Sequence, residues 1–323
     1  MFGQSPQARP GPLVGRLAPS PTGVLHLGNA RSFLLAWLDA RSRGGEVVLR
    51  IEDLDGPRVR SGADQQAMED LQWLGLDWDR GPIYQRPRLA QYRAALEKLA
   101  ALGLAYPCVC TRKDVEKAAS APHAGEEGPV YPGTCRGRWQ SAQQAEAETG
   151  KKACWRFAIP KETKVEFVDR FAGQVQYHMD QQFGDFVIWK KDDEPAYQLA
   201  VVVDDAEQGI TSVLRGDDLL SSGGRQILIY RALDFPLPEF VHVPLVVGVD
   251  GRRLAKRHGD TTLRRFRQSG LSASQMLEWL AQTLGPALKR KPEQIQTAAD
   301  LIEGFHLPLL PPEQVVWDGD LDG

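Results

Sequence analysis

His26 and Gly28 are the first residues whose types and spacing could do chemistry, because they stand where a strand-like run gives way to a helical pattern. The apolar run over 12–18 (PLVGRLA) ends in the turn 19–23 (PSPTG), and the helical pattern begins near Leu27. A helix that begins there offers free backbone N–H groups to a phosphate. His26 can donate a hydrogen bond to a phosphoryl oxygen, and Gly28 lets a flat base approach the backbone. This spacing predicts a nucleotide site; the alternative is an ordinary helix start with an incidental histidine.

The cysteines form a second candidate site. Cys108, Cys110 and Cys135 lie close together in the sequence, and Cys154 follows later. Three thiolates and one further ligand satisfy a tetrahedral Zn²⁺ ion. Ligand preference alone would select Cys154 as the fourth ligand, but Cys154 lies in an alternating, strand-like run, where a lone cysteine is more often a packed small residue. The alternative is a set of reduced cysteines without metal.

Two charged motifs follow apolar runs. The first is 50–55 (RIEDLD), at the end of the strand-like run 46–51, and the second is the glycine-flanked loop 248–260 (GVDGRRLAKRHGD), after the apolar run 239–247. Each motif alone is compatible with a solvated surface turn. Their position at strand ends makes them candidates for binding a charged substrate.

The elements that must position these residues alternate between strand and helix. Helical patterns cover 61–74, 86–103 and 222–233. After a break the alternation returns with 197–205 (YQLAVVVDD), 213–218 (VLRGDD) and the apolar run 239–247. This order predicts an α/β fold with a parallel sheet. From about 105 to 194 the pattern changes to a Gly/Pro/Ala-rich stretch and period-2 runs at 153–159 and 165–178, which predict an insertion of loop and antiparallel sheet.

The length of 323 residues suits about two structural units. We expect a split catalytic domain over 1–107 and 195–260, and an insertion over 108–194. The remainder, 261–323, would be a small helical C-terminal subdomain with a helix near 273–285. It is too short to hold a second large domain.

Composition narrows the class of protein. A net charge of −3 and 42% hydrophobic residues exclude a wholly disordered chain and a strongly basic coat protein, although a local basic face could still bind RNA. The chain has no apolar run of about 18 residues and no signal-like apolar stretch at its N-terminus. We therefore expect a soluble, cytoplasmic protein without membrane contact.

The segment 18–31 (APSPTGVLHLGNAR) resembles the first signature of the glutamyl-tRNA synthetases, a class I aminoacyl-tRNA synthetase family, and 253–257 (RLAKR) resembles their second signature. Arg253 and Ala255 stand where the family usually has lysine and serine. The resemblance implies a Rossmann-like catalytic domain that binds ATP with Mg²⁺. It also implies that His26 and Lys256 are catalytic and that Lys256 stabilises the leaving pyrophosphate. The ATP-binding residues would be Thr22, His26, Gly28, Asn29 and Lys256.

The same resemblance implies a glutamate pocket. A planar guanidinium recognises the side-chain carboxylate of glutamate through two parallel hydrogen bonds, whereas the neutral amide of glutamine pairs with it poorly. Glu52, an anion, suits the ammonium group of the substrate. The residues that match the family's glutamate positions are Arg16, Ala18, Ser20, Glu52, Tyr197 and Arg215.

The cysteine pattern is similar to that of a subgroup of short relatives, the glutamyl-queuosine tRNA(Asp) synthetases, in which C-x-C is followed by Y-x3-C. This resemblance implies one structural Zn²⁺ on Cys108, Cys110, Tyr131 and Cys135, with Cys154 and His123 as reserves. Members of the subgroup lack an anticodon-binding domain. They activate L-glutamate with ATP without tRNA and transfer it to queuosine in the anticodon of tRNA(Asp).

Three readings of function remain open at this point. The resemblance to the subgroup implies queuosine glutamylation by what we expect to be a monomer. A truncated conventional synthetase that charges the 3′ end of tRNA(Glu) is the second reading. The third is a non-catalytic nucleotide- or RNA-binding relative, suggested by Arg253 and Ala255.

Overall fold

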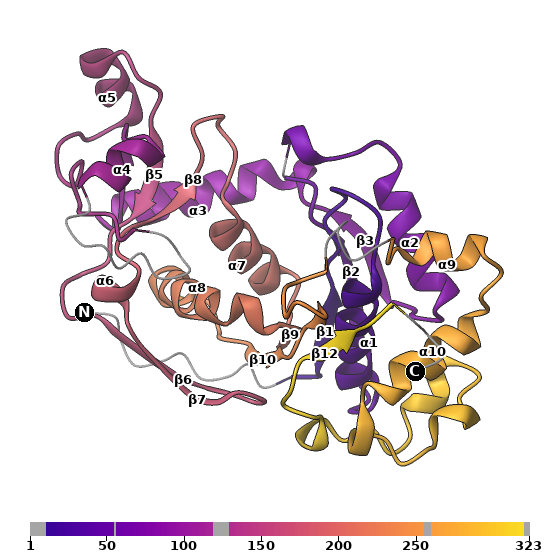
Figure 1. Ribbon diagram of the computed structural model, residues 1–323. Helices are drawn as coiled ribbons and strands as arrows, with labels where there is room; N and C mark the ends of the chain where they lie inside the picture. Colours follow the sequence, from indigo (N-terminus) through magenta and orange to yellow (C-terminus); the bar gives the residue numbers. More distant parts are fainter. Residues whose placement is uncertain (1–10, 55, 119–128, 255–259, 320–323) are drawn as a thin grey trace.

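The fold centres on a parallel sheet in the computed structural model, which describes residues 11–54, 56–118, 129–254 and 260–319 (Figure 1). Two sets of parallel strands make up this sheet: β1 (Val14–Leu17), β2 (Glu46–Ile51) and β3 (Arg80–Tyr84), then β9 (Ser212–Gly216) and β10 (Glu239–Val243). β9 lies beside β1, where the Thr211 amide donates to the Val14 carbonyl at 2.9 Å. β1, β2 and β3 form one hydrogen-bonded ladder and β9 and β10 belong to another, and with β9 beside β1 the strands lie in the order β3-β2-β1-β9-β10. The chain switches direction across the sheet between β1 and β9, where such a fold opens a crevice at the carboxyl ends of its strands.

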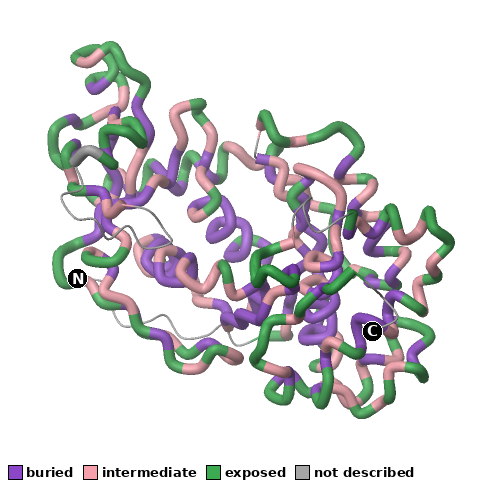
Figure 2. Tube along the Cα trace, viewed as in Figure 1, coloured by how far each residue is buried: buried purple, intermediate pink, exposed green. Residues whose placement is uncertain are grey.

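Helices cover the sheet. They are α1 (Leu27–Arg41), α2 (Ala63–Trp73), α3 (Leu89–Ala101), α7 (Tyr197–Glu207) and α8 (Leu220–Leu233). All four residues of β1 and all five of β9 are buried, as expected for parallel strands covered on both faces. Figure 2 shows this burial concentrated in the central strands and helices.

An antiparallel arm lies at the left of Figure 1. Its sheet has the order β4-β5-β8, formed by β4 (Ala105–Cys108), β5 (Cys154–Phe157) and β8 (Phe186–Trp189). The arm also carries α4 (Arg112–Ala118) and α5 (Ala142–Thr149). These elements match the loop and antiparallel sheet that the sequence predicts for the insertion.

A hairpin inside the predicted insertion joins the central sheet. It consists of β6 (Lys164–Asp169) and β7 (Gly173–His178), and it is followed by the short helix α6 (Met179–Gln182). Asp169, the last residue of β6, pairs with Phe240 of β10 in a parallel bridge. The hairpin therefore extends the sheet beyond β10. The division of the chain into domains at 107/108 and 194/195 remains a prediction.

The C-terminal segment packs on α1. It contains α9 (Leu263–Gln268), α10 (Ala273–Gln282), several 3-10 turns and β12 (Val315–Trp317), which pairs in parallel with β11 (Val246–Gly248). Ser272 caps α10 because its hydroxyl accepts a hydrogen bond from the Gln275 amide at 3.2 Å. Met276 and Leu280 of α10 are fully buried in the same hydrophobic core as Leu34 of α1.

Most predicted elements coincide with observed ones, and the apolar run that begins at Tyr197 is the helix α7. Within the part of the chain that the structure describes, no helix is both long enough and apolar enough to cross a lipid bilayer.

Candidate active site

A cavity of about 520 Å³ opens at the carboxyl ends of β1, β2 and β9. It collects every predicted substrate residue that the structure describes: Arg16, Ala18, Ser20, Thr22, His26, Gly28, Asn29, Glu52, Tyr197 and Arg215. These residues come from four separate stretches of chain, and the fold brings all four to one cavity. Lys256 lies outside the described residues, but Arg253 and Leu254, which precede it in the same loop, line the cavity.

The N-terminus of α1 forms one wall of the cavity. His26 is the N-cap in an extended conformation, and its Nδ1 accepts a hydrogen bond from the Gly28 amide at 3.1 Å. Asn29 Oδ1 accepts in return from the His26 amide at 3.1 Å, which completes a capping box. A neutral imidazole that accepts at Nδ1 carries its proton on Nε2, so the ring keeps one N–H donor. Burial, followed by repulsion from Arg253, lowers the pKa of His26, which keeps the ring neutral at pH 7.

Residues that follow the charged loop hold the start of α1 in place. The Leu27 amide donates to the Thr261 carbonyl at 3.0 Å, and the Leu263 amide donates to the Leu25 carbonyl at 2.9 Å. These two hydrogen bonds join the first signature (18–31) to the segment that follows the second (253–257). Two motifs more than 200 positions apart are thus brought to the same cavity.

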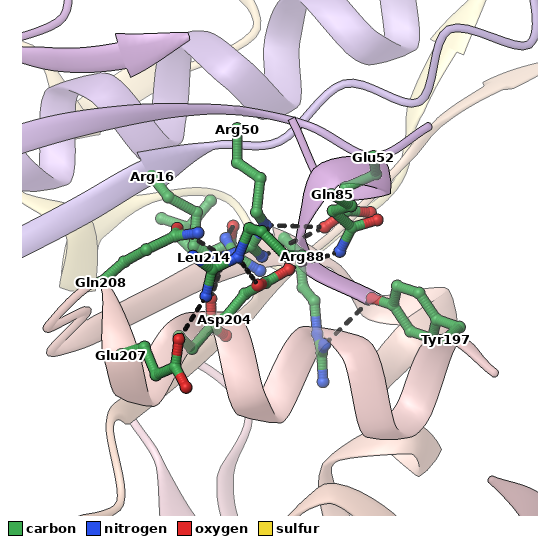
Figure 3. Close-up of polar contacts among 12 residues, drawn as sticks. Arg16, Arg50, Glu52, Gln85, Arg88, Tyr197, Asp204, Glu207, Gln208 and Leu214 are labelled. Carbon is green, nitrogen blue, oxygen red and sulfur yellow. Dashed lines mark hydrogen bonds and ion pairs between the residues drawn. The ribbon is translucent and has the colours of Figure 1, made fainter. Parts of the chain in front are cut away.

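A network of two arginines and three acidic or amide groups, which we call the floor, underlies the cavity (Figure 3). Arg16 and Glu52 of this network line the cavity, and Arg50, Asp205 and Gln208 hold them from beneath. Arg50 is fully buried; its Nη1 donates to Asp205 at 2.7 Å and to Gln208 at 3.1 Å, and its Nη2 donates to Glu52 at 3.1 Å. Arg16 lies 3.5 Å from the same Asp205 carboxylate. Burial raises the pKa of Glu52, and the charges of Arg50 and Arg16 oppose this rise. The two arginines therefore favour the charged form of Glu52, against the effect of its burial.

Arg215 forms the opposite side of the pocket. It lies on β9, and its Nη1 donates to the Tyr197 hydroxyl at 3.3 Å. Tyr197 is the first residue of α7, and its side chain is partly exposed to the cavity. A second residue of α7, Asp204, anchors this helix to the rest of the domain by accepting hydrogen bonds from Gln85, Arg88 and Tyr92 (2.7–2.9 Å; Gln85 and Arg88 are labelled in Figure 3).

Sequence reasoning missed the charged groups beneath the pocket. It did not assign a role beneath the pocket to Arg50, Asp205, Gln208 or His242. One signal was available: an arginine inside the apolar run 46–51 indicates a buried partner of opposite charge.

The cysteine cluster lies in the arm. The sulfur atoms of Cys108, Cys110 and Cys135 all lie within 4.8 Å of one another and could hold a metal ion such as zinc. The Tyr131 hydroxyl lies 3.3 Å from Cys108 Sγ and 3.7 Å from Cys110 Sγ, and it accepts a hydrogen bond from the Cys135 amide at 2.9 Å. Four potential ligand atoms thus converge, which fits a tetrahedral ion.

Cys154 has a different environment from the other three cysteines. Its thiol donates to the Cys108 backbone carbonyl at 3.2 Å. Its hydrogen bond to Cys108 and its burial raise the pKa of Cys154, which favours the neutral thiol over a thiolate ligand. A hydrogen bond with Cys154 has the largest effect on Cys108 and lowers its pKa. Burial opposes this shift, and hydrogen bonds with Tyr131 and Arg156 lower the pKa further. The net lowering favours the Cys108 thiolate. His123, the other reserve ligand, lies outside the described residues.

Comparison with known proteins places this architecture in a family. Residues 12–309 match the model for tRNA synthetases class I (E and Q), catalytic domain. The chain is 48% identical to the glutamyl-Q tRNA(Asp) synthetase of Symbiobacterium thermophilum, over 94% of this chain and 95% of that protein. It is 39% identical to the glutamate–tRNA ligase of Geobacter sulfurreducens, over 94% of this chain but 64% of that protein.

A solved structure shows the same fold. The glutamate tRNA ligase of Elizabethkingia meningosepticum, in complex with its amino acid, superposes with a TM-score of 0.82 and 25% identity, over 96% of this chain and 68% of that chain. The sequence and structural agreement together confirm the α/β class I synthetase fold. The chain belongs to the glutamyl-Q tRNA(Asp) synthetases, within the class I tRNA synthetases for glutamate and glutamine.

Proposed function

We propose that this chain activates L-glutamate with ATP, without tRNA, and transfers the glutamyl group to queuosine in the anticodon of tRNA(Asp). The observation that carries the proposal is the convergence of two guanidinium groups and one carboxylate beside a capped helix N-terminus, in one cavity. The similarity to the glutamyl-Q tRNA(Asp) synthetase of Symbiobacterium thermophilum supports the choice of acceptor.

Glutamate recognition follows from the charges around the pocket. The side-chain carboxylate of the substrate pairs with Arg16 and Arg215, and Glu52 binds the substrate ammonium group. Ala18 and Ser20 follow Arg16 along the chain and line the same cavity, and Tyr197 lines it with Arg215, from which its hydroxyl accepts a hydrogen bond. This arrangement leaves the α-carboxylate free to react, because the fixed cations are used on the other carboxylate.

Adenylate formation uses the start of α1. ATP enters as its Mg²⁺ complex, in which the ion offsets phosphate charge. Thr22, Gly28 and Asn29 line the nucleotide side of the cavity, and His26 Nε2–H donates to a phosphoryl oxygen. One oxygen of the α-carboxylate bonds to the α-phosphorus while the bond from that phosphorus to pyrophosphate breaks. Lys256 stabilises the charge that develops on the departing pyrophosphate.

Transfer forms an ester. A hydroxyl of queuosine attacks the carbonyl carbon of glutamyl-adenylate, the bond from this carbon to the phosphate oxygen breaks, and AMP leaves with the electron pair. The hydroxyl proton passes to the phosphate of the departing AMP. The chain then has only to position the two reactants.

The arm holds one structural Zn²⁺ in this proposal. Cys108, Cys110, Cys135 and Tyr131 would be its ligands, and the ion would tie the end of β4 to the segment around Tyr131 and Cys135. The arm then supports the bound nucleic acid.

Glutamate-dependent exchange of labelled pyrophosphate into ATP tests the first step. Purified protein without tRNA should support exchange with glutamate and at least about tenfold less with glutamine, whose neutral amide pairs poorly with a guanidinium. Arg215→Ala should raise the KM for glutamate far more than the KM for ATP, and Arg43→Ala, which removes a partly exposed arginine outside the cavity, should change neither. Equal losses for both substrates in Arg215→Ala would mean that the pocket is wrongly assigned.

A further inference from the structure

A row of polar side chains lies behind Arg215 on three neighbouring strands. Arg215 of β9 stands opposite His242 of β10 in the parallel register, and Asp169 ends β6 on the far side of β10. His242 and Asp169 are each only 1% exposed, and the substrate cavity does not include them among its lining residues. Any effect of these two residues on the substrate must therefore pass through Arg215.

The distances fix the direction of each hydrogen bond. Arg215 Nε donates to His242 Nε2 at 2.9 Å, so this ring nitrogen must be an acceptor. His242 Nδ1 lies 2.6 Å from Asp169 Oδ2 and must carry the ring proton. The imidazole is thus neutral, with one defined tautomer. Burial lowers the pKa of His242, with Arg215 and Arg16 opposing the Asp169 charge, which agrees with the neutral form.

Asp169 is itself fixed by the backbone. Its Oδ1 accepts hydrogen bonds from the amides of Phe171 at 3.0 Å, Ala172 at 2.8 Å and His242 at 3.1 Å. Its other oxygen is left to the His242 ring. A carboxylate held in this way fixes both the orientation and the tautomer of a histidine, as carboxylates do behind metal-bound and catalytic imidazoles.

Arg215 is held at each of its three nitrogens. Besides Nε, its Nη1 donates to the Tyr197 hydroxyl at 3.3 Å and its Nη2 donates to the Leu219 carbonyl at 3.4 Å. A guanidinium has five N–H groups. Among the described residues these contacts use one on each nitrogen, which leaves one on Nη1 and one on Nη2 for the two oxygens of a carboxylate.

We propose that Asp169 and His242 are positioning residues that orient the Arg215 guanidinium for recognition of the substrate carboxylate. This inference rests on the proposed glutamate site. It also gives the β6–β7 hairpin a role, because the hairpin brings Asp169 to the edge of β10. The effect is specific for the amino acid, since neither residue touches the nucleotide side of the cavity.

Two substitutions of His242 separate positioning from simple packing. An asparagine amide reaches the position of Nδ1, so His242→Asn keeps a donor to Asp169 and loses the acceptor for Arg215. A glutamine amide reaches the position of Nε2, so His242→Gln keeps an acceptor for Arg215 and loses the donor to Asp169. If His242 only filled space, the two variants would not differ in their effect on glutamate binding.

The two variants should differ in which property changes: His242→Asn should mainly change the KM for glutamate, and His242→Gln should mainly change the free energy of unfolding. His242→Asn should raise the KM for glutamate by about ten- to a hundredfold, the range for losing a hydrogen bond to a charged group, with the KM for ATP within about twofold of wild type. His242→Gln should raise the glutamate KM by less than about tenfold, yet should unfold at lower urea because it leaves the buried Asp169 oxygen without a donor.

Asp169→Asn tests the tautomer. Asparagine retains the oxygen that accepts from the backbone, but its NH₂ group would donate to His242 Nδ1 and move the ring proton to Nε2, toward Arg215. It should raise the glutamate KM as His242→Asn does. Glu166→Gln, the same change of charge at an exposed position of β6, is the matched control and should leave both KM values unchanged.

All four variants are assayed as full-length protein by glutamate-dependent pyrophosphate exchange, with urea unfolding in parallel. Equal glutamate KM values for His242→Asn and His242→Gln, or an ATP KM that rises in step with the glutamate KM, would overturn the positioning role while leaving the proposed function intact. Wild-type protein without glutamate-dependent exchange would instead overturn the proposed function and this inference with it.

Discussion

Replacing Arg50 with methionine tests how the floor of the pocket is held together. The Arg50 guanidinium is fully buried and donates to Asp205, Gln208 and Glu52. Methionine fills similar space but removes the ion-pair partner of Glu52 and leaves Asp205 with Arg16 alone. Removing one partner of a buried ion pair costs about 3–5 kcal/mol. Urea unfolding should therefore show a loss in free energy of that size.

The matched control is Arg80→Met. Arg80 also lies in the central sheet, but its side chain is 43% exposed and pairs with the exposed Glu46 at 3.3 Å. Surface pairs of this kind contribute about 0–1 kcal/mol. The two substitutions remove the same group, so the difference between them measures the effect of burial.

Arg50→Met should also change how glutamate binding depends on pH. Burial raises the pKa of Glu52, and Arg50 is the largest influence that opposes the rise. Without Arg50 the pKa of Glu52 rises further, so the carboxylate that binds the substrate ammonium is protonated at higher pH. The KM for glutamate should then begin to increase at a higher pH than in wild type as the solution is acidified. If Arg50→Met proves as stable as Arg80→Met, and its KM for glutamate begins to rise at the same pH as in wild type, the proposed role of Arg50 is refuted.

Three further predictions concern the nucleotide and metal sites. Lys256→Ala should lower pyrophosphate exchange by about 10²–10³-fold if the lysine acts at the developing charge, and an unchanged rate would remove it from the mechanism. Gly28→Ala would place a Cβ 3.0 Å from Cε1 of His26; it should displace the ring, weaken the N-cap by about 1 kcal/mol and raise the KM for ATP but not for glutamate. Metal analysis should find about one zinc per chain. Cys135→Ser should abolish zinc binding and Cys154→Ser should retain it, and the opposite result would contradict the ligand assignment.

Local features of the site could be predicted from the sequence. The turn 19–23 and the helix that begins at Leu27 are encoded by neighbouring residues, and α1 begins there. The C-x-C and Y-x3-C patterns likewise place their ligands in short segments, and the structure brings Tyr131 to the three clustered cysteines. The roles of the glutamate and ATP residues came from resemblance to a family, and those roles remain proposals.

Long-range pairings could not be read from local patterns. Arg50 and Asp205 are 155 positions apart, and nothing in the neighbourhood of either residue specifies the other. The same holds for His242 and Asp169, which meet because β6 pairs with β10 at a single register position. A short apolar run such as 197–205 also fits a helix or a strand by periodicity alone. The structure shows this run as the helix α7, which packs against α3 and α8.

The identity of the acceptor is tested most directly with labelled glutamate. The protein is incubated with radiolabelled glutamate, ATP and bulk tRNA that contains queuosine, and nuclease digestion then identifies the nucleoside that carries the label. We predict label on queuosine, and tRNA from cells that cannot make queuosine should remain unlabelled. Label on the terminal adenosine would contradict this prediction and would indicate a synthetase that charges the 3′ end of tRNA(Glu).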